Sequence, residues 1–202
     1  MDYQHFRYES PLEEEFARNF FKYISDKVSF TTQHEIKTDW GTFRLDFAVQ
    51  FNNEKVGIEC DGTDYHDAFR DEFRDSLILG TRQVDVIYRF RGPDLFYHME
   101  DCLYLLSQWE PIMFSKKGNS LLETLASDRI KEYGLKKEPG PRLFTYPGNR
   151  LNNEFNFMVI ERKTKHGRQF WQHLFDFANH PGNCGKNVDE LMQLYKQTQY
   201  HQ

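Results

Sequence analysis

Acidic side chains interrupt two apolar segments within residues 42–66, TFRLDFAVQFNNEKVGIECDGTDYH. Asp46 lies within the first segment. Glu59 and Asp61 end the second, and His66 follows shortly after. Carboxylate oxygens are the ligands that hard divalent ions prefer, and such an ion can activate water and neutralise a phosphate. An imidazole nearby can transfer or orient a proton near neutral pH. These residue types at this spacing indicate metal-assisted hydrolysis.

The two apolar segments predict the two strands of a β-hairpin. Apolar residues take alternate positions, which is typical of a strand with one buried face. They are Phe43, Leu45, Phe47 and Val49 in the first segment, and Val56, Ile58 and Cys60 in the second. Asn52-Asn53 lies between the segments, and asparagine tolerates the left-handed conformations that two-residue hairpin turns require. We therefore expect a tight turn there, and this turn fixes which residues of the strands face each other.

The expected register places acidic side chains next to each other. With a two-residue turn, Asp46 lies directly opposite Glu59, on the face that does not carry the apolar set. The same register places Arg44 opposite Asp61, as an ion pair. Like charges directly opposite each other on a sheet are destabilising. Two carboxylates held that close must share a proton, contact a cation or bind a metal ion.

Elements on both sides of the hairpin complete an α/β pattern. Ser10-Pro11-Leu12-Glu13 predicts the start of a helix to about residue 26, with Ser at the N-cap, Pro in the first turn and Glu three residues later. We further expect strands at 29–37 and 83–90, and helices at 67–79 and from 92 to about 107. Depending on the turn at residues 39–41, either Gln33 or His34 becomes the neighbour of Asp46.

Five motifs in this order resemble the PD-(D/E)XK nuclease superfamily, and more narrowly its branch related to very-short-patch-repair endonucleases. They are Ser10-Pro11-Leu12-Glu13, Arg44-Leu45-Asp46-Phe47, Ile58-Glu59-Cys60-Asp61-Gly62, His66 and Asp71-Glu72-Phe73-Arg74. The resemblance covers about residues 9–108. It implies a restriction-endonuclease-like core, with a helix, a three-strand meander, a helix, a strand and a helix. A Gln commonly precedes the strand pair in this family, which favours Gln33 over His34.

The resemblance implies a role for each candidate residue. Asp46 and Glu59 would ligate Mg²⁺, which Mn²⁺ could replace, with the Cys60 main-chain carbonyl as a third ligand. His66 would activate or orient water, or protonate the leaving group. Glu13 would complete a second metal position or hold a bound water, although its place in the capping box also explains it without any catalytic role.

Asp61 departs from the usual superfamily pattern, which has Lys two residues after the Glu. The positive charge of that Lys must then come from His66, Arg74 or a second metal ion. Asp61 itself either pairs with Arg44 for structural reasons or contributes field and a water-mediated metal contact. We favour a mixed role for Asp61.

The expected activity is that of a Mg²⁺-dependent endonuclease that hydrolyses phosphodiester bonds, with DNA as the favoured substrate. Two alternatives stay open, a catalytically inactive nucleic-acid-binding module with a nuclease fold and an RNA-cleaving enzyme. The presence of both Asp46 and Glu59 counts against the inactive module, because a dead site has no reason to keep an uncompensated acidic pair.

The chain of 202 residues is predicted to divide near Trp109-Glu110-Pro111 into a nuclease-like core, 1–110, and a basic accessory region, 111–202. The core carries 12 Lys and Arg against 22 Asp and Glu, and the accessory region carries 14 against 9. The net charge of −5 alone speaks against a nucleic-acid binder, but a basic region beside an acidic catalytic half could attract phosphates. This α+β extension is expected to contain helices at 119–133, 168–179 and 188–198 and a strand at 155–162.

The cellular environment is predicted from cysteine use and from apolar runs. The three cysteines are sparse and odd in number, which argues for a reducing compartment and against a disulfide framework. No run of the sequence has the length of a membrane span, and the N-terminus lacks the apolar stretch of a signal peptide. We therefore expect a cytoplasmic protein with no membrane partner.

Overall fold

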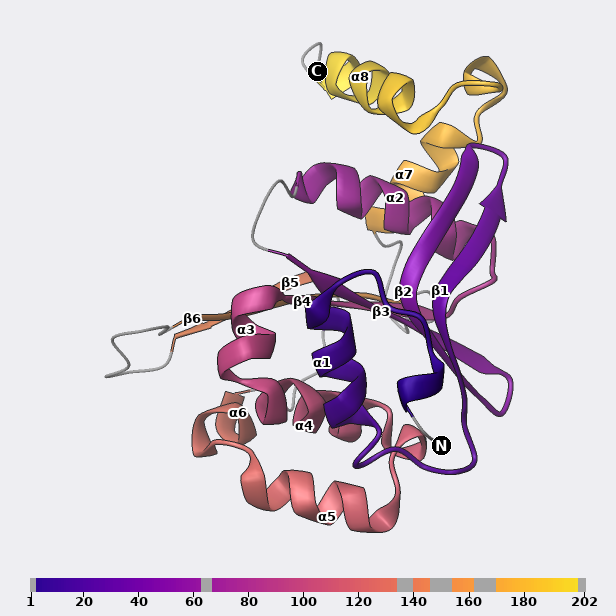
Figure 1. The fold of residues 1–202 in the computed structure, drawn as a ribbon. Coiled ribbons are helices and arrows are strands. Elements are labelled where there is room, and N and C mark those ends of the chain that lie inside the picture. The colour runs from indigo at the N-terminus through magenta and orange to yellow at the C-terminus, as the bar shows by residue number, and fades with distance from the viewer. Residues whose placement is uncertain (1–2, 63–66, 134–139, 146–153, 162–169, 200–202) are drawn as a thin grey trace.

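A computed structural model describes residues 3–62, 67–133, 140–145, 154–161 and 170–199. Its elements form an α/β fold around a six-stranded mixed sheet with the strand order β1-β2-β3-β4-β6-β5 (Figure 1). The strands are β1 (Ser29–Thr38), β2 (Gly41–Phe51), β3 (Glu54–Asp61), β4 (Val86–Arg91), β5 (Gly140–Thr145) and β6 (Glu154–Glu161). The helices are η1 (Tyr3–His5), α1 (Pro11–Phe20), α2 (Ala68–Gly80), α3 (Gly92–Tyr97), α4 (Met99–Trp109), η2 (Pro111–Met113), α5 (Lys116–Leu125), α6 (Asp128–Tyr133), α7 (Phe170–Ala178), η3 (Pro181–Asn183) and α8 (Val188–Gln199).

The hairpin of β2 and β3 has the predicted turn and register. Asn52 has a φ of 51°, in the left-handed region that a short turn requires. The antiparallel ladder pairs Phe51 with Glu54 and continues to Phe47 opposite Ile58. One further step in this register sets Asp46 against Glu59, so the predicted two-residue turn is confirmed.

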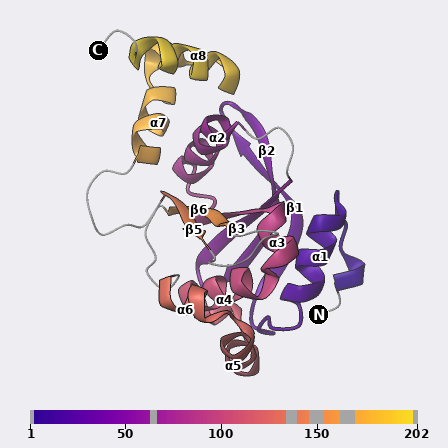
Figure 2. The same cartoon turned by 90° about the vertical axis from the view of Figure 1, so that its left-hand side faces the viewer.

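Helices cover both faces of the sheet, whereas the sequence predicted that β2 has a single buried face. Figure 2 shows α1, α3 and α4 on one side of the sheet, and α2 and α7 on the other. Phe47 and Val49 pack in the core cluster under α1 and α4, which includes Phe16 and Leu106. Leu45 instead packs in the cluster under α2 and α7. The prediction that all four odd-numbered apolar residues of β2 share one face is therefore wrong.

The side chains of β2 change faces at Asp46. Residues two positions apart in a regular strand lie on the same face, yet Leu45 and Phe47 lie on opposite faces. The ladder between β1 and β2 is interrupted at the corresponding position, and Gln33 there has a φ of 50°. Such local distortions re-aim side chains and increase strand twist. Since His34 pairs with Leu45, the register assigns Gln33 to the position across from Asp46.

The parallel strand β4 places a cation inside the sheet. α2 connects β3 to β4, and the register sets Arg89 beside Glu59. The β4 residues from Val86 to Phe90 are all buried, as expected for a strand covered on both faces. Arg89 is among them and is only 3% exposed. A guanidinium so far from water requires anionic partners.

The helices of residues 1–110 form where the sequence predicted them but with different ends. Ser10 caps α1 by accepting a hydrogen bond from the Glu13 amide, but α1 ends at Phe20 rather than near residue 26. The helix expected from 92 to about 107 is broken into α3 and α4 at His98, whose φ of −138° is not helical. Among the described residues, no helix has both the length and the apolar character needed to cross a membrane.

Residues beyond 110 extend the same sheet and cover α2. β6 pairs antiparallel with β4, and β5, which was not predicted, pairs with β6. α7 and α8 pack against α2 through a cluster that includes Phe73, Leu174 and Leu191. The basic segments around 136, 150 and 162–168 lie outside the described residues. The division at residue 110 stays a prediction.

Candidate active site

Where β2 and β3 separate, side-chain carboxylates take the place of main-chain carbonyls as hydrogen-bond acceptors. Beyond the pair of Phe47 and Ile58, the Asp46 amide donates to Glu59 Oε2 at 3.3 Å, and the Cys60 amide donates to Asp46 Oδ2 at 2.8 Å. Each side chain thus accepts a hydrogen bond that a main-chain carbonyl accepts in a regular hairpin. The predicted approach of Asp46 to Glu59 is confirmed, whereas the catalytic roles of the two residues stay predictions.

The electrostatic environment of Asp46 disfavours its charged form. Burial, which is the largest cause, and the negative charges of Glu59, Glu13 and Asp61 together raise the pKa of Asp46 from 3.8 to about 8. The hydrogen bond from the Cys60 amide acts in the opposite direction but does not balance them. Asp46 therefore either holds a proton near neutral pH or requires a cation nearby.

Glu59 lies deeper than Asp46 and faces two arginines. Burial raises its pKa, while the charges of Arg74 and Arg89 oppose this shift. Arg74 Nη2 lies 2.7 Å from Glu59 Oε1, and Arg89 Nη2 lies 3.6 Å from the same oxygen. The Arg74 contact is an ion pair by distance, but Oε1 is buried and accepts no well-aligned hydrogen bond. Oε1 of Glu59 thus has an ion-pair partner but no donor in hydrogen-bonding geometry.

Arg89 joins the carboxylates of β3 to those of α2. Its Nε and Nη2 donate to the two oxygens of Asp75 at 2.6 Å and 2.9 Å, and its Nη1 donates to Asp61 at 2.8 Å. Burial alone would lower the pKa of Arg89, but Asp75, Glu59 and Asp61 raise it well above its usual value. The guanidinium is therefore charged and holds Asp61 in place.

The predicted ion pair between Arg44 and Asp61 is wrong. The Arg44 guanidinium contacts Glu9 instead, and Asp61 pairs with Arg89. The change of face at Asp46 explains the difference, because it alters where Arg44 points relative to β3. Arg74 and Arg89 are the cations that contact Glu59 among the described residues, and the role expected of the superfamily's Lys stays a prediction.

Glu13 has the capping role that its sequence context predicted and also lies near the acidic pair. Its carboxylate accepts hydrogen bonds from the Ser10 hydroxyl at 2.9 Å and the Glu9 amide at 3.0 Å. Gln33 Nε2 donates to Glu13 Oε2 at 2.6 Å, which connects α1 to the distorted position of β1. The negative charge of Glu13 contributes to the raised pKa of Asp46. The capping role of Glu13 is therefore confirmed, whereas its role at a metal site stays a prediction.

Cys60 and His66 complete the set of predicted site residues. The Cys60 thiol belongs to the apolar cluster under α1 and α4, and burial raises its pKa well above the usual value. A neutral thiol in an apolar core is a poor ligand for a hard cation, so any metal contact of Cys60 must come from its main-chain carbonyl, as predicted. His66 lies outside the described residues.

The donor set fits a hard divalent cation, although its side chains do not converge into a finished site. Asp46, Glu59 and the Cys60 carbonyl supply the oxygen ligands that Mg²⁺ and Mn²⁺ prefer. Within the described residues, no three His, Cys, Asp or Glu side chains are grouped closely enough to hold a metal ion. The ion pairs of Glu59 with Arg74 and Arg89 account for this, because they direct its carboxylate toward α2.

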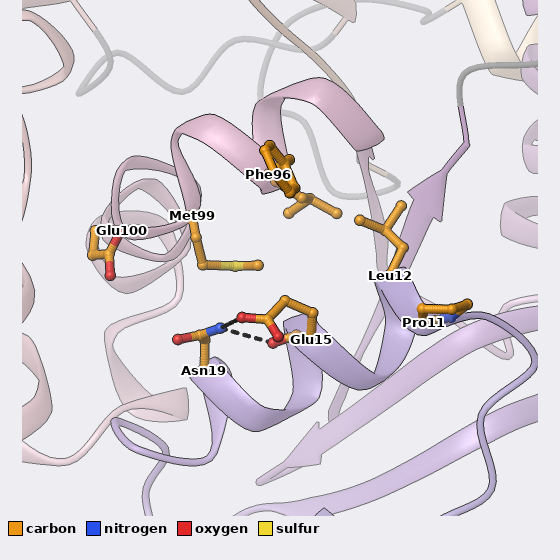
Figure 3. Close-up of a pocket in the computed structure, with 8 residues that line it drawn as sticks. Pro11, Leu12, Glu15, Asn19, Phe96, Met99 and Glu100 are labelled. Carbon is orange, nitrogen blue, oxygen red and sulfur yellow. Dashed lines mark hydrogen bonds between the residues drawn. The ribbon is translucent and has the colours of Figure 1, made fainter.

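A pocket of about 510 Å³ lies next to this end of the sheet, between α1 and the α3–α4 segment (Figure 3). It is lined by Pro11, Leu12, Glu15, Asn19, Leu95, Phe96, Met99 and Glu100. The polar groups on its α1 side are held locally, since Asn19 donates to Glu15 and Arg18 pairs with Glu15. We therefore place the candidate site at the strand ends and not in this pocket.

No family model matches the chain, and no curated protein or solved structure matches it significantly. The fold that the coordinates establish is α/β with a mixed sheet. The resemblance to nucleases stays a prediction that rests on the sequence motifs.

Arg89 is the residue of the candidate site that the sequence interpretation missed. It lies in the run VIYRF, where every neighbour is apolar or aromatic. A charged residue flanked by apolar and aromatic residues within a strand is a signal for a buried ion pair. Asp75 gives a second signal, because it lies four residues after Asp71 on one helix face.

Proposed function

We propose that the protein is a metal-dependent endonuclease that hydrolyses phosphodiester bonds, with DNA as its substrate. One observation carries the proposal. Asp46 and Glu59 approach each other where β2 and β3 separate, in surroundings that raise the pKa of Asp46 to about 8. An arrangement that is unfavourable for two carboxylates becomes favourable when they share a divalent cation.

The order of the elements supports the proposal. α1, the β1–β3 meander, α2, β4 and the α3–α4 segment follow the order of the restriction-endonuclease-like core that the motifs imply. Asp46 lies in the middle of β2, and Glu59 lies near the end of β3, as the resemblance requires. β6 and β5 extend this sheet on the far side of β4.

The residues have distinct parts in the proposed hydrolysis. Asp46, Glu59 and the Cys60 carbonyl would hold Mg²⁺ or Mn²⁺, which neutralises phosphate charge and lowers the pKa of a bound water. Asp61, fixed by Arg89, adds negative field behind these ligands. Glu13 would hold a water or a second cation from α1. His66 stays the candidate for proton transfer.

The test is cleavage of plasmid DNA and of single-stranded DNA with Mg²⁺ or Mn²⁺, compared with the same reactions in EDTA. Asp46→Asn and Glu59→Gln should each reduce the cleavage rate by more than ~100-fold, because loss of even a second-shell metal contact costs ~10–100-fold. Glu54→Gln is the matched control, since Glu54 lies at the turn end of the same strand. Cleavage that survives both substitutions contradicts the proposal.

A second candidate function is nucleic-acid binding without catalysis. It is favoured by the ion pairs of Glu59 with Arg74 and Arg89, which already compensate one of the two carboxylates. This candidate predicts binding that is independent of divalent ions and no cleavage under any condition. DNA and RNA offered side by side, with and without Mn²⁺, distinguish it from a DNA nuclease and from an RNA-cleaving enzyme.

A further inference from the structure

We propose that Arg74 is a switchable cation: it pairs with Glu59 in the metal-free protein and binds the substrate phosphate once Glu59 ligates a divalent ion. The inference rests on the proposed function and assigns a residue to phosphate recognition at the same site. It follows from the different environments of the two arginines that face Glu59.

Arg89 is fixed by its contacts. Its side chain is 4% exposed, and Nε, Nη1 and Nη2 all donate to carboxylates of Asp75 and Asp61. The Asp75 side chain is itself 1% exposed. Moving Arg89 would leave buried charges without a partner, which is strongly unfavourable. Arg89 therefore keeps its place whether or not Glu59 binds an ion.

Arg74 is held much less firmly. Its side chain is 21% exposed, and its nearest carboxylate contact is Glu59 Oε1 at 2.7 Å. Its Nη2 also donates to the main-chain oxygen of Arg44. Its Nη1 lies 4.0 Å from Asp75, whose two oxygens already accept hydrogen bonds from Arg89. The Glu59 charge is thus the main electrostatic attraction that holds the Arg74 guanidinium against β3.

Binding of a cation by Glu59 removes that attraction. When Glu59 ligates a divalent ion, its charge is neutralised by that ion, and the ion and Arg74 then repel each other. The Arg74 side chain is 21% exposed, against 4% for Arg89, so its guanidinium can turn toward a phosphate at the site once the attraction to Glu59 is lost. Guanidinium groups bind phosphate oxygens in a two-pronged geometry, which suits Arg74 to neutralise the charge of the reacting group.

The decisive experiment measures Mn²⁺ binding without nucleic acid, by titration calorimetry and by the electron paramagnetic resonance signal of free Mn²⁺. Arg74→Gln should bind Mn²⁺ about tenfold more tightly than the parent protein, because a competing positive charge is removed. The same variant should lose turnover on DNA by about 100-fold, because a donor to the transition-state charge is lost. Opposite changes in the two measurements are not expected of a residue that only stabilises the fold.

Arg70→Gln is the matched control, since Arg70 lies one turn earlier on α2 and its side chain is 57% exposed. It should change neither measurement. Arg74→Lys provides a second variant that keeps the positive charge without the planar fork. It should bind Mn²⁺ as the parent does and turn over more slowly.

The outcomes separate this inference from the proposed function. Unchanged or weaker Mn²⁺ binding in Arg74→Gln overturns the inference, as does full turnover in that variant or loss of Mn²⁺ binding in Arg74→Lys. Absence of Mn²⁺ binding by the parent protein, or parent-level binding by Glu59→Gln, overturns the metal-dependent function itself and the inference with it. If the parent binds Mn²⁺ through Glu59 and only the Arg74 results disagree, the function stands and the switch fails.

Discussion

The acidic groups at the strand ends are compensated by two different kinds of partner. On the α2 side, guanidinium groups provide the compensation, since Arg89 contacts Asp61 and Asp75, and Arg74 contacts Glu59. Buried charges are tolerated when they are paired and hydrogen-bonded in this way. Next to α2, arginines therefore already compensate the negative charges.

For Asp46 and Glu13, the compensation comes from uncharged donors. The Cys60 amide donates to Asp46, and the Gln33 side chain donates to Glu13. These bonds do not balance burial and the neighbouring carboxylates, so the pKa of Asp46 rises to about 8. An added cation would therefore be stabilised most next to Asp46, whose charge is the least compensated of the group. The strands that carry Asp46 and Glu59, β2 and β3, lie side by side in Figure 1.

The largest effect on stability is expected at Arg89, which compensates the carboxylates next to α2. Arg89→Met should lower the free energy of unfolding by about 3–5 kcal/mol, because it removes the guanidinium that donates to both oxygens of the buried Asp75 carboxylate. Urea denaturation at pH 7 measures the change. Arg70→Met, on the exposed face of α2, should cost less than ~1 kcal/mol. Equal losses in the two variants would show that the buried cluster does not hold the fold together.

The pH dependence of stability tests whether the charged form of Asp46 is disfavoured in the folded protein. In the folded protein the pKa of Asp46 is about 8, against an ordinary value of 3.8. The folded state therefore holds this proton more tightly than the unfolded chain, and the stability contributed by protonated Asp46 is lost as the pH rises through this range. Asp46→Asn cannot ionise, so it should be more stable than the parent protein at pH 8, by on the order of 1–3 kcal/mol.

Urea denaturation at pH 4 and pH 8 in EDTA measures this difference. The parent protein should lose more stability than Asp46→Asn between the two values, and parallel pH profiles would contradict the prediction. Addition of Mn²⁺ at pH 8 should then stabilise the parent by about 2.7 kcal/mol at a hundredfold excess over its dissociation constant. The same addition should leave Asp46→Asn nearly unchanged.

The smallest effect is expected at Glu13. Glu13→Gln removes one of the charges that raise the pKa of Asp46, so the titration of the Asp46 carboxyl carbon, followed by NMR, should move to lower pH. The stability change should stay near ~1 kcal/mol, the usual weight of a helix cap. Glu14→Gln is the control, because Glu14 is exposed on the same turn of α1. An Asp46 titration that shifts equally in both variants would remove Glu13 from the site.

Local features of the sequence predicted the elements and one part of the site. The Asn52-Asn53 turn and the alternating strands give the correct hairpin register, because contacts across a two-residue turn depend on residues close in the chain. The cap at Ser10 is correct for the same reason. The ends of α1 and the break at His98 were missed, since tertiary packing overrides helix periodicity there.

The sequence alone predicts that Asp46 and Glu59 lie opposite each other, because a short turn and the alternation of side chains along a strand leave one register for the two strands. Which cations contact these carboxylates depends on the tertiary structure. At the distortion opposite Gln33, the side chains of β2 change faces at Asp46. β4 pairs parallel with β3, which brings Arg89, rather than Arg44, to Asp61. These contacts join residues far apart in the chain, so they depend on how whole elements pack and not on any local pattern.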